Sequence, residues 1–138
     1  MEKEIISSLD ELHIVIKALD DTIKSKDIIV LLQGTLASGK TTLVKEYVKH
    51  LGLDDDVTSP TFSIQSLYGE DIFHYDTYNK TLEEFIAIGL LEEFEKSGIH
   101  FVEWGDEKLK NILDQYGFEN ITIKIEKEDK RRRYVIQS

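Results

Sequence analysis

The chain has 138 residues, no cysteine and a formal net charge of −10 at pH 7, from 27 acidic and 17 basic residues. The lack of cysteine excludes disulfides and thiolate metal sites and fits a reducing, cytoplasmic compartment. No apolar run reaches the roughly 18 residues of a membrane span, and the N-terminal segment lacks the apolar region of a secretory signal. The acidic balance disfavours direct binding to a polyphosphate such as RNA, so any nucleic-acid role is expected to be indirect.

The first half of the chain predicts a strand, a helix, a second strand and a second helix within one domain, residues 1–138. Residues 3–6 predict a short strand, and the apolar residues from Leu9 to Ile23 recur at the spacing of an amphipathic helix. The five apolar residues 28–32 predict a buried strand. Beyond residue 42, apolar residues again recur at helical spacing until Gly52, which is typical of a helix end.

The segment between that buried strand and the second helix, GTLASGKTT, has the spacing of a P-loop. In a P-loop, glycines let backbone N–H groups curl around a phosphate at the N-terminus of a helix. We therefore expect Lys40 to contact the β- and γ-phosphate oxygens of ATP and the Thr41 hydroxyl to ligate Mg²⁺. The alternative is a glycine-containing turn with an accidental lysine. The predicted nucleotide-binding residues are Gly34, Thr35, Leu36, Ala37, Ser38, Gly39, Lys40, Thr41 and Thr42.

The second half predicts a hairpin, helices and closing strands. Residues 62–68 and 71–78 are rich in aromatic and β-branched residues and flank Gly69, which indicates an antiparallel hairpin. Thr81 and Glu84 have the capping-box spacing and open a helical region that Gly89 is expected to split. A strand over 99–102, a helix over 108–116 and strands over 120–125 and 132–137 follow. The predicted fold is α/β: a P-loop NTPase-like mixed sheet with an antiparallel hairpin, flanked by helices.

Two carboxylates are the candidates for catalysis. Glu103 follows an apolar strand, at the sheet edge where ligands of open α/β folds bind, so we expect it to hold Mg²⁺; the alternative is a surface carboxylate. Asp76 is a candidate for orienting the attacking water or holding the water shell of the metal. Strand alternation places His74 and Asp76 on one face. For His74, a packed or solvated strand histidine is favoured over a catalytic base.

Two further segments carry polar groups. Pro60, the one proline of the chain, stiffens a loop whose Ser59 and Thr61 hydroxyls are candidates for donating to a phosphate. The alternative is a plain turn leading into the hairpin. All three arginines stand together at 131–133, and one interpretation is a solvated strand start that balances nearby acidic residues.

Four ordered motifs, GTLASGKTTL, VTSPTFSI, FHYDTY and FVEWGDE, resemble those of the TsaE family, also called YjeE. These are small bacterial P-loop ATPases that work in making threonylcarbamoyladenosine on tRNA, and the resemblance spans roughly residues 8–136. It implies ATP hydrolysis that drives the cycle of a threonylcarbamoyl-transferase complex, with partners of the TsaD and TsaB type. The acidic charge predicts an indirect or weak contact with tRNA, and the lack of a long apolar run predicts no membrane partner.

The resemblance assigns roles by position. It places the phosphate loop on residues 34–42, the magnesium ligands on Thr41 and Glu103, and the catalytic aspartate on Asp76. It places Trp104 and the loop 59–62 beside the nucleotide, and it implies that an arginine near the C-terminus, Arg132 or Arg133, lies against the nucleotide. The register of those arginines stays open. The sequence departs from the family pattern at Ala37-Ser38, usually Gly-Ala, and at Asn79, usually arginine.

Two other functions share the P-loop. A small-molecule kinase would also need Mg²⁺ and an aspartate, but kinases of that type usually close an arginine-bearing lid, and this chain has no arginine before residue 131. A nucleotide-gated binding module that does not hydrolyse ATP is the second alternative. Because no arginine lies near the P-loop in sequence, we expect slow hydrolysis by the chain alone.

Overall fold

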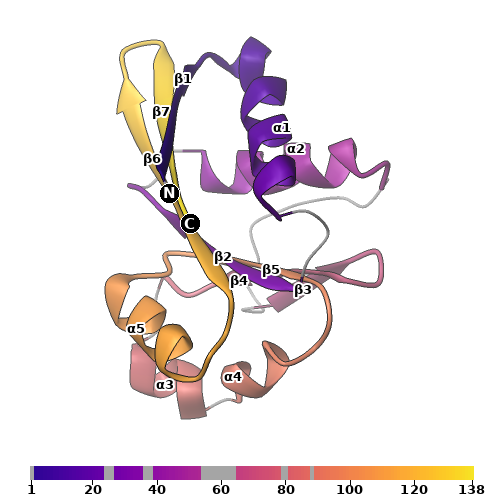
Figure 1. The fold of residues 1–138 in the computed structure, drawn as a ribbon, viewed down its shortest axis with the longest axis vertical. Coiled ribbons are helices and arrows are strands. Elements are labelled where there is room, and N and C mark those ends of the chain that lie inside the picture. Colours follow the sequence, from indigo (N-terminus) through magenta and orange to yellow (C-terminus); the bar gives the residue numbers. More distant parts are fainter. Residues whose placement is uncertain (1, 24–26, 36–38, 54–64, 79–80, 88) are drawn as a thin grey trace.

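The computed structural model describes residues 2–23, 27–35, 39–53, 65–78, 81–87 and 89–138. Over these residues the chain forms one mixed sheet with helices on both faces (Figure 1). The strands are β1 (Glu2–Ser7), β2 (Ile28–Gln33), β3 (Gln65–Tyr68), β4 (Ile72–Asp76), β5 (Ile99–Glu103), β6 (Asn120–Glu128) and β7 (Arg131–Gln137). The helices are α1 (Leu12–Ile23), α2 (Lys40–His50), α3 (Leu82–Ala87), α4 (Leu90–Glu93) and α5 (Glu107–Gln115), and a 3₁₀ turn, η1 (Leu9–Glu11), precedes α1.

The sheet has the strand order β1-β7-β6-β2-β5-β4-β3. Its centre is parallel: β2 pairs with β5 and β6, and β4 pairs with β5. Both edges are antiparallel, with β1 on β7 and β3 on β4. The register places Leu32 of β2 and Asp76 of β4 on either side of Glu103 of β5. The carboxyl ends of these three strands therefore meet at one edge, which is where ligands of open α/β sheets bind.

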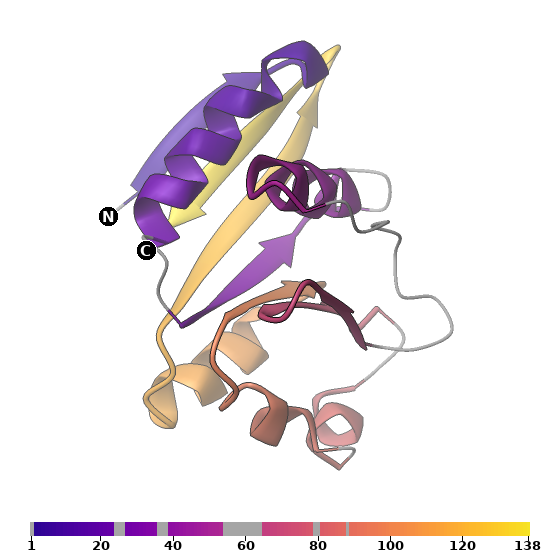
Figure 2. The ribbon, with the colours of Figure 1, turned by 90° about the vertical axis from the view of Figure 1, so that its right-hand side faces the viewer.

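Two apolar cores lie on the two faces of the sheet. Figure 2 shows from the side the layers of helices that cover these faces. Alternate residues of β2 divide between them: Val30 and Leu32 pack under α1 and α2, and Ile29 and Leu31 pack against the layer of α3, α4 and α5. A strand buried on both faces reads as a continuous apolar run, because neither face meets water. This explains why residues 28–32 are all apolar.

Several local predictions are confirmed. Gly89, with φ +83°, separates α3 from α4. The capping box forms, because the Glu84 N–H donates to the Thr81 hydroxyl (3.1 Å) and the Thr81 N–H donates to the Glu84 carboxylate (3.2 Å). The hairpin is shorter than predicted where it is described, and residues 62–64 of its first strand lie outside the described residues. The first helix begins at Leu12, later than predicted, after the 3₁₀ turn.

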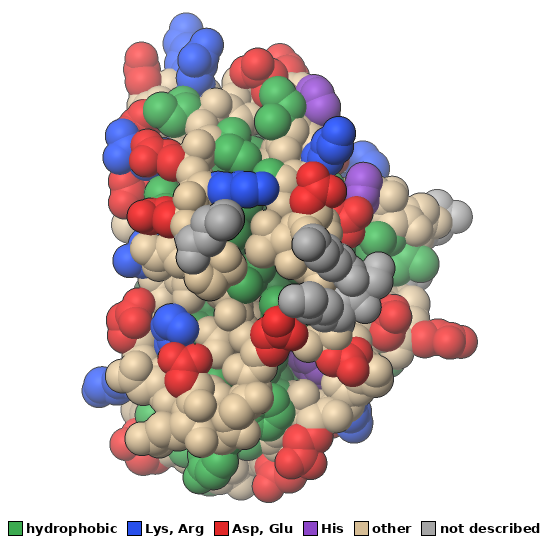
Figure 3. All heavy atoms as spheres, viewed as in Figure 1, with side chains coloured by type: hydrophobic (Ala, Val, Ile, Leu, Met, Phe, Trp, Pro, Cys, Tyr) green, Lys and Arg blue, Asp and Glu red, His purple; other side chains and the backbone are tan. Residues whose placement is uncertain are grey.

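The surface is predominantly acidic. On the face shown in Figure 3, Asp and Glu side chains are spread from top to bottom, and a group of Lys and Arg side chains lies at the top, over the β6–β7 turn. This agrees with the net charge of −10. No helix in the described ranges is long and apolar enough to cross a membrane.

Candidate functional site

The candidate site begins where β2 turns into α2. Gly39 is the residue before the helix, and its φ of +111° is a conformation that side-chain-bearing residues rarely adopt. The helix then starts at Lys40, with the Leu43 N–H donating to the Gly39 carbonyl (2.9 Å). This is the strand, glycine turn and helix N-terminus that the phosphate-loop prediction requires. Leu36, Ala37 and Ser38, three of the predicted phosphate contacts, lie outside the described residues.

Lys40 is folded back against its own loop. Its ammonium donates to the carbonyl oxygens of Gly34 (2.8 Å) and Thr35 (2.9 Å) and lies 3.8 Å from the centre of the Trp104 ring. The residue is only 5% exposed. Burial lowers the pKa of Lys40, and the nearby carboxylates of Glu103 and Asp76 partly offset that shift. The site therefore holds a desolvated cation at the mouth of the loop.

Thr41 and Glu103 are in direct contact. The Thr41 hydroxyl lies 2.9 Å from Oε2 and 3.1 Å from Oε1 of Glu103, and the glutamate is 4% exposed. They come from segments far apart in the sequence, and the parallel pairing of β2 with β5 brings them together. Thr42, the next residue of α2 after Thr41, has an exposed side chain. The structure thus juxtaposes the two residues predicted as metal ligands.

The donor set fits Mg²⁺ in one specific way. A hydroxyl and a carboxylate are the hard oxygen ligands that Mg²⁺ prefers, and Mg²⁺ at P-loops takes its other ligands from substrate phosphates and water. In the described part of the chain, no group of three or more His, Cys, Asp or Glu side chains is arranged to hold a metal ion by itself. The Thr41 hydroxyl and the Glu103 carboxylate are thus compatible with two positions of a Mg²⁺ coordination shell.

Asp76 lies beside this pair. It ends β4, it is the register partner of Glu103, and its side chain is partly exposed. The Tyr78 N–H donates to its Oδ1 (3.0 Å). Next to it, the Thr77 hydroxyl and N–H both donate to the Glu103 carbonyl, at 2.9 and 3.2 Å. The ends of β4 and β5 are therefore tied together, with two carboxylates side by side at the edge.

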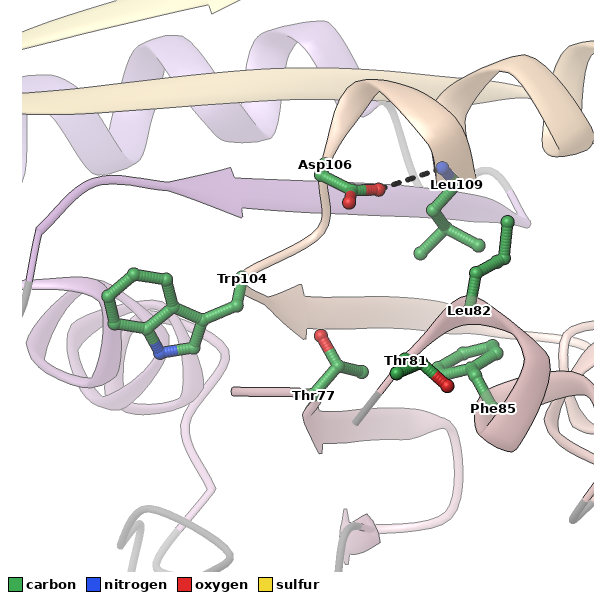
Figure 4. A pocket seen from close by; sticks show the side chains of 7 residues that line it. All are labelled: Thr77, Thr81, Leu82, Phe85, Trp104, Asp106 and Leu109. Atoms are coloured by element: carbon green, nitrogen blue, oxygen red, sulfur yellow. Dashed lines mark hydrogen bonds between the residues drawn. The ribbon is translucent and has the colours of Figure 1, made fainter. Parts of the chain in front are cut away.

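Trp104 contacts Lys40 with its ring and also lines a pocket beside α3 and α5. Its φ of +70° is unusual for a residue other than glycine, and its N–H donates to the Leu32 carbonyl (2.9 Å). Its ring lies 4.7 Å from that of Tyr78, centre to centre. Figure 4 shows a pocket beyond it, from which the Trp104 ring points away. That pocket is lined by Thr77, Thr81, Leu82, Phe85, Trp104, Asp106 and Leu109.

The two candidate arginines lie in different surroundings. The side chain of Arg132 passes so close to the phosphate loop that a methyl group on Gly39 would lie 3.3 Å from its Nε. Arg133 is instead paired with Glu4 of β1 (Nε to Oε1, 3.2 Å) and with Glu128 of β6. Of these two arginines, the structure therefore brings only Arg132 to the phosphate loop. Ser59 and Thr61 lie outside the described residues.

Two further residues lie at the site: Tyr68, which the sequence did not indicate, and His74, whose contact with Glu103 the sequence did not indicate. His74, interpreted above as a packed or solvated strand histidine, is fully buried, and its Nε2 lies 2.5 Å from Oε2 of Glu103. The hydroxyl of Tyr68 lies 2.9 Å from its Nδ1. The available signal was the alternation that places His74 on the same face as Asp76.

A family model described as "Threonylcarbamoyl adenosine biosynthesis protein TsaE" matches residues 6–135. The chain belongs to the TsaE family. A TsaE relative from Treponema pallidum is 38% identical over 91 residues, which cover 64% of this chain and 67% of the relative. One from Rickettsia bellii is 34% identical over 132 residues, 92% of this chain and 89% of the relative.

These relatives are named tRNA threonylcarbamoyladenosine biosynthesis protein TsaE, so the family takes part in that biosynthesis. The matched segment of the TsaE relative from Rickettsia felis spans 65% of its length. Among solved structures, the crystal structure of Bacillus subtilis YdiB superposes on this chain with a TM-score of 0.65 and 24% sequence identity. The match covers 100% of this chain and 87% of the YdiB chain. At that identity the likeness shows the fold, and the mixed α/β sheet is confirmed.

Proposed function

We propose that this protein is the ATP-hydrolysing component of the system that makes N6-threonylcarbamoyladenosine on tRNA. In this role it is a Mg²⁺-dependent, cytoplasmic, single-domain P-loop ATPase that drives the cycle of a threonylcarbamoyl-transferase complex of the TsaD and TsaB type. Membership of the TsaE family supports the pathway. The observation that carries the activity is the contact of Thr41 with Glu103 (2.9 Å) beside the buried ammonium of Lys40.

The chain's own residues divide the work of phosphoryl transfer. The N–H groups at the start of α2 and the ammonium of Lys40 would bind the phosphates and stabilise their negative charge. To reach a phosphate, Lys40 exchanges its bonds to the Gly34 and Thr35 carbonyls for phosphate oxygens. This exchange has a low desolvation cost, because the ammonium is already out of water in the structure.

Thr41 and Glu103 are the residues that would hold Mg²⁺. A metal held by these two residues would supply positive charge that offsets the negative charge developing on the phosphates during transfer. We expect Asp76, the register partner of Glu103, to orient the attacking water or to hold the water shell of the metal. Arg132, beside Gly39, is placed to lie against the nucleotide.

The acidic surface supports an indirect role in tRNA modification. A net charge of −10 and carboxylates spread over the face in Figure 3 repel a phosphate backbone. The protein would then act on a partner that holds the tRNA, and any contact of its own with the tRNA would be weak.

The test has two stages. Steady-state phosphate release from Mg·ATP is measured for the wild type, for Lys40→Ala and for the control Lys49→Ala, which changes an exposed lysine on the same helix. We expect release by the wild type and the control and loss of release in Lys40→Ala. The second stage adds the transferase partners and tRNA and asks whether modification becomes catalytic. Phosphorylation of an acceptor in place of phosphate release would instead indicate a kinase.

A further inference from the structure

We propose that His74 and Tyr68 are positioning residues, which fix the carboxylate of Glu103 so that one of its oxygens stays turned toward the metal. Neither residue is expected to touch the nucleotide. The inference rests on the proposed function, because it takes Glu103 to be the metal-holding carboxylate.

The geometry is a continuous line of hydrogen bonds through the sheet. The Tyr68 hydroxyl lies 2.9 Å from Nδ1 of His74, Nε2 of His74 lies 2.5 Å from Oε2 of Glu103, and the Thr41 hydroxyl completes the line at 2.9 Å from that oxygen. The imidazole is fully buried and the carboxylate nearly so. The line runs from the edge strand β3 through β4 and β5 to the first turn of α2.

The direction of each bond follows from the chemistry of the groups. A carboxylate accepts hydrogen bonds, so the His74 ring donates from Nε2. A neutral imidazole that donates from Nε2 presents Nδ1 as an acceptor, and the Tyr68 hydroxyl is the matching donor. The carboxylate of Glu103 therefore sets the tautomer of His74, and the hydrogen bond from Tyr68 to Nδ1 stabilises that tautomer and holds the ring in place. The same logic operates at metal-binding histidines, where an outer hydrogen bond fixes the orientation of the ligand.

The two oxygens of Glu103 are held differently. Oε2 is contacted by His74 and Thr41, whereas Oε1 has its contact at 3.1 Å from Thr41, and we find no other partner for it in the described residues. If the Thr41 hydroxyl turned to a metal, Oε2 would remain held by His74, and Oε1 would be the carboxylate oxygen left available to that metal. Without His74, the carboxylate would be free to rotate and would lose this preference.

A second buried pair in the same chain serves as an internal control. His100 donates from Nε2 to the Lys96 carbonyl (2.9 Å), away from the site, and its Nδ1 accepts from the Tyr75 hydroxyl (2.7 Å). Tyr75 and His100 also lie on β4 and β5, and both are buried. Removing either tyrosine hydroxyl deletes one buried Tyr–His hydrogen bond, so the costs in stability should be similar. Only the Tyr68–His74 pair should influence metal binding.

The experiment measures ADP affinity by calorimetry with Mg²⁺ and with EDTA, and binding of Mn²⁺ to the ADP complex by electron paramagnetic resonance. The variants are His74→Ala, His74→Gln, Tyr68→Phe and the control Tyr75→Phe. Because outer-shell partners change metal affinity by about 10–100-fold, we expect a loss of that order in His74→Ala and a smaller loss in Tyr68→Phe. Affinity for ADP in EDTA should stay within about twofold of wild type.

The conservative variant separates positioning from packing. The side-chain amide of Gln can donate from the position of Nε2, so His74→Gln should recover part of the metal affinity lost in His74→Ala. Equal losses with Mg²⁺ and with EDTA, or an equal effect of Tyr75→Phe, would overturn the proposal. If His74→Ala does not fold, Tyr68→Phe against Tyr75→Phe decides the question alone. A wild type without any Mg²⁺-dependent nucleotide binding would overturn the proposed function and this inference together, whereas normal wild-type binding with unaffected variants would overturn the inference alone.

Discussion

The ammonium nitrogen of Lys40 lies over the ring of Trp104, 3.8 Å from its centre. A cation on an aromatic face at this distance is attracted by the ring, and the attraction is strongest when both groups are out of water. Trp104 is the one tryptophan in the sequence, so tryptophan emission reports on this single position, whose ring contacts both Lys40 and Tyr78. The same lysine is expected to meet the phosphates, which couples the ring to nucleotide binding.

The first prediction is that tryptophan fluorescence changes when nucleotide binds, because Lys40 must move toward the phosphates. The variant Lys40→Met should shift the emission even without nucleotide, since it removes the cation from the ring. Lys96→Met, which changes an exposed lysine paired with Glu93, is the matched control and should leave the emission unchanged. A flat titration at saturating ATP would show that Lys40 and Trp104 do not respond to the nucleotide.

The second prediction concerns Glu103. In Glu103→Ala, Mg²⁺-dependent hydrolysis should fall at least about tenfold, because even outer-shell contacts at metal sites are worth that much. Binding of ADP in EDTA should change little, since the glutamate acts on the metal side. Hydrolysis is followed by phosphate release and binding by calorimetry. Equal losses in both measurements would mean that Glu103 supports the fold of the loop and does not hold the metal.

The third prediction is that the isolated protein hydrolyses ATP slowly and that its partner complex accelerates it. A supplied arginine can raise turnover at a P-loop by about 10³–10⁵-fold. Arg133 is paired with Glu4 and Glu128 and is therefore occupied elsewhere. Arg132 passes beside Gly39, and we expect it to lie against the nucleotide and not at the γ-phosphate, where an accelerating arginine acts. Phosphate release is compared with and without partners. Fast turnover by the chain alone, unchanged by partners, would contradict the prediction.

The fourth prediction tests the turn before β5. Gly98 has φ +137°, and a methyl group there would lie 2.2 Å from the Asp71 carbonyl oxygen. Gly98→Ala should lower the free energy of unfolding by about 2–4 kcal/mol, from backbone strain together with overpacking. Gly117→Ala, at φ +78° with nothing within 4 Å, adds strain alone and should cost about 1–2 kcal/mol. Denaturant titrations measure both, and equal costs would refute the steric argument.

The fifth prediction is a loss of stability in mild acid caused by His100. Burial lowers the pKa of His100 from 6.5, and this exceeds the opposing effects of the Lys96 carbonyl, Glu93 and Asp27. Below pH 6.5 the unfolded chain therefore binds this proton more readily, and the stability falls until the pH reaches the lower folded pKa. The slope is at most about 1.4 kcal/mol per pH unit for one proton. His100→Phe should reduce the slope in that window, and the exposed His13→Gln should not.

The elements of this fold could be predicted because each carries a local signal. The continuous apolar run of residues 28–32 indicates a strand buried on both faces, and the glycines of the P-loop mark the turn that follows. The order of the strands has no such signal. The pairing of β1 with β7 joins residues from the two ends of the chain, and neither strand specifies its neighbour. The phosphate loop directly follows one apolar strand and Glu103 ends another, so both could be assigned to the carboxyl edge of the sheet without knowing the order of its strands.

His74 shows where sequence reasoning stops. Alternation along β4 groups His74 with Asp76, but all the residues from Ile72 to Tyr75 are buried, so the pattern does not say which face carries the site. The partner of His74 depends on the register of β4 against β5, which sets Asp76 opposite Glu103. The contact of Lys40 with Trp104 likewise requires the left-handed backbone of Trp104, a conformation that the sequence does not indicate.

The central strand β2 meets its two neighbours only late in the chain, with Ile28 opposite Ile99 and Ile29 opposite Asn120. During synthesis the phosphate loop leaves the ribosome well before either neighbour exists, and the entropy of closing such long loops must be overcome before the strands can pair. A nascent chain that ends before β5 therefore has the phosphate loop but lacks Glu103. Its strand β2 also lacks both pairing partners, β5 and β6. Nucleotide binding should thus appear only once the last third of the chain has been made, and incomplete translation products should not compete with the finished protein for ATP.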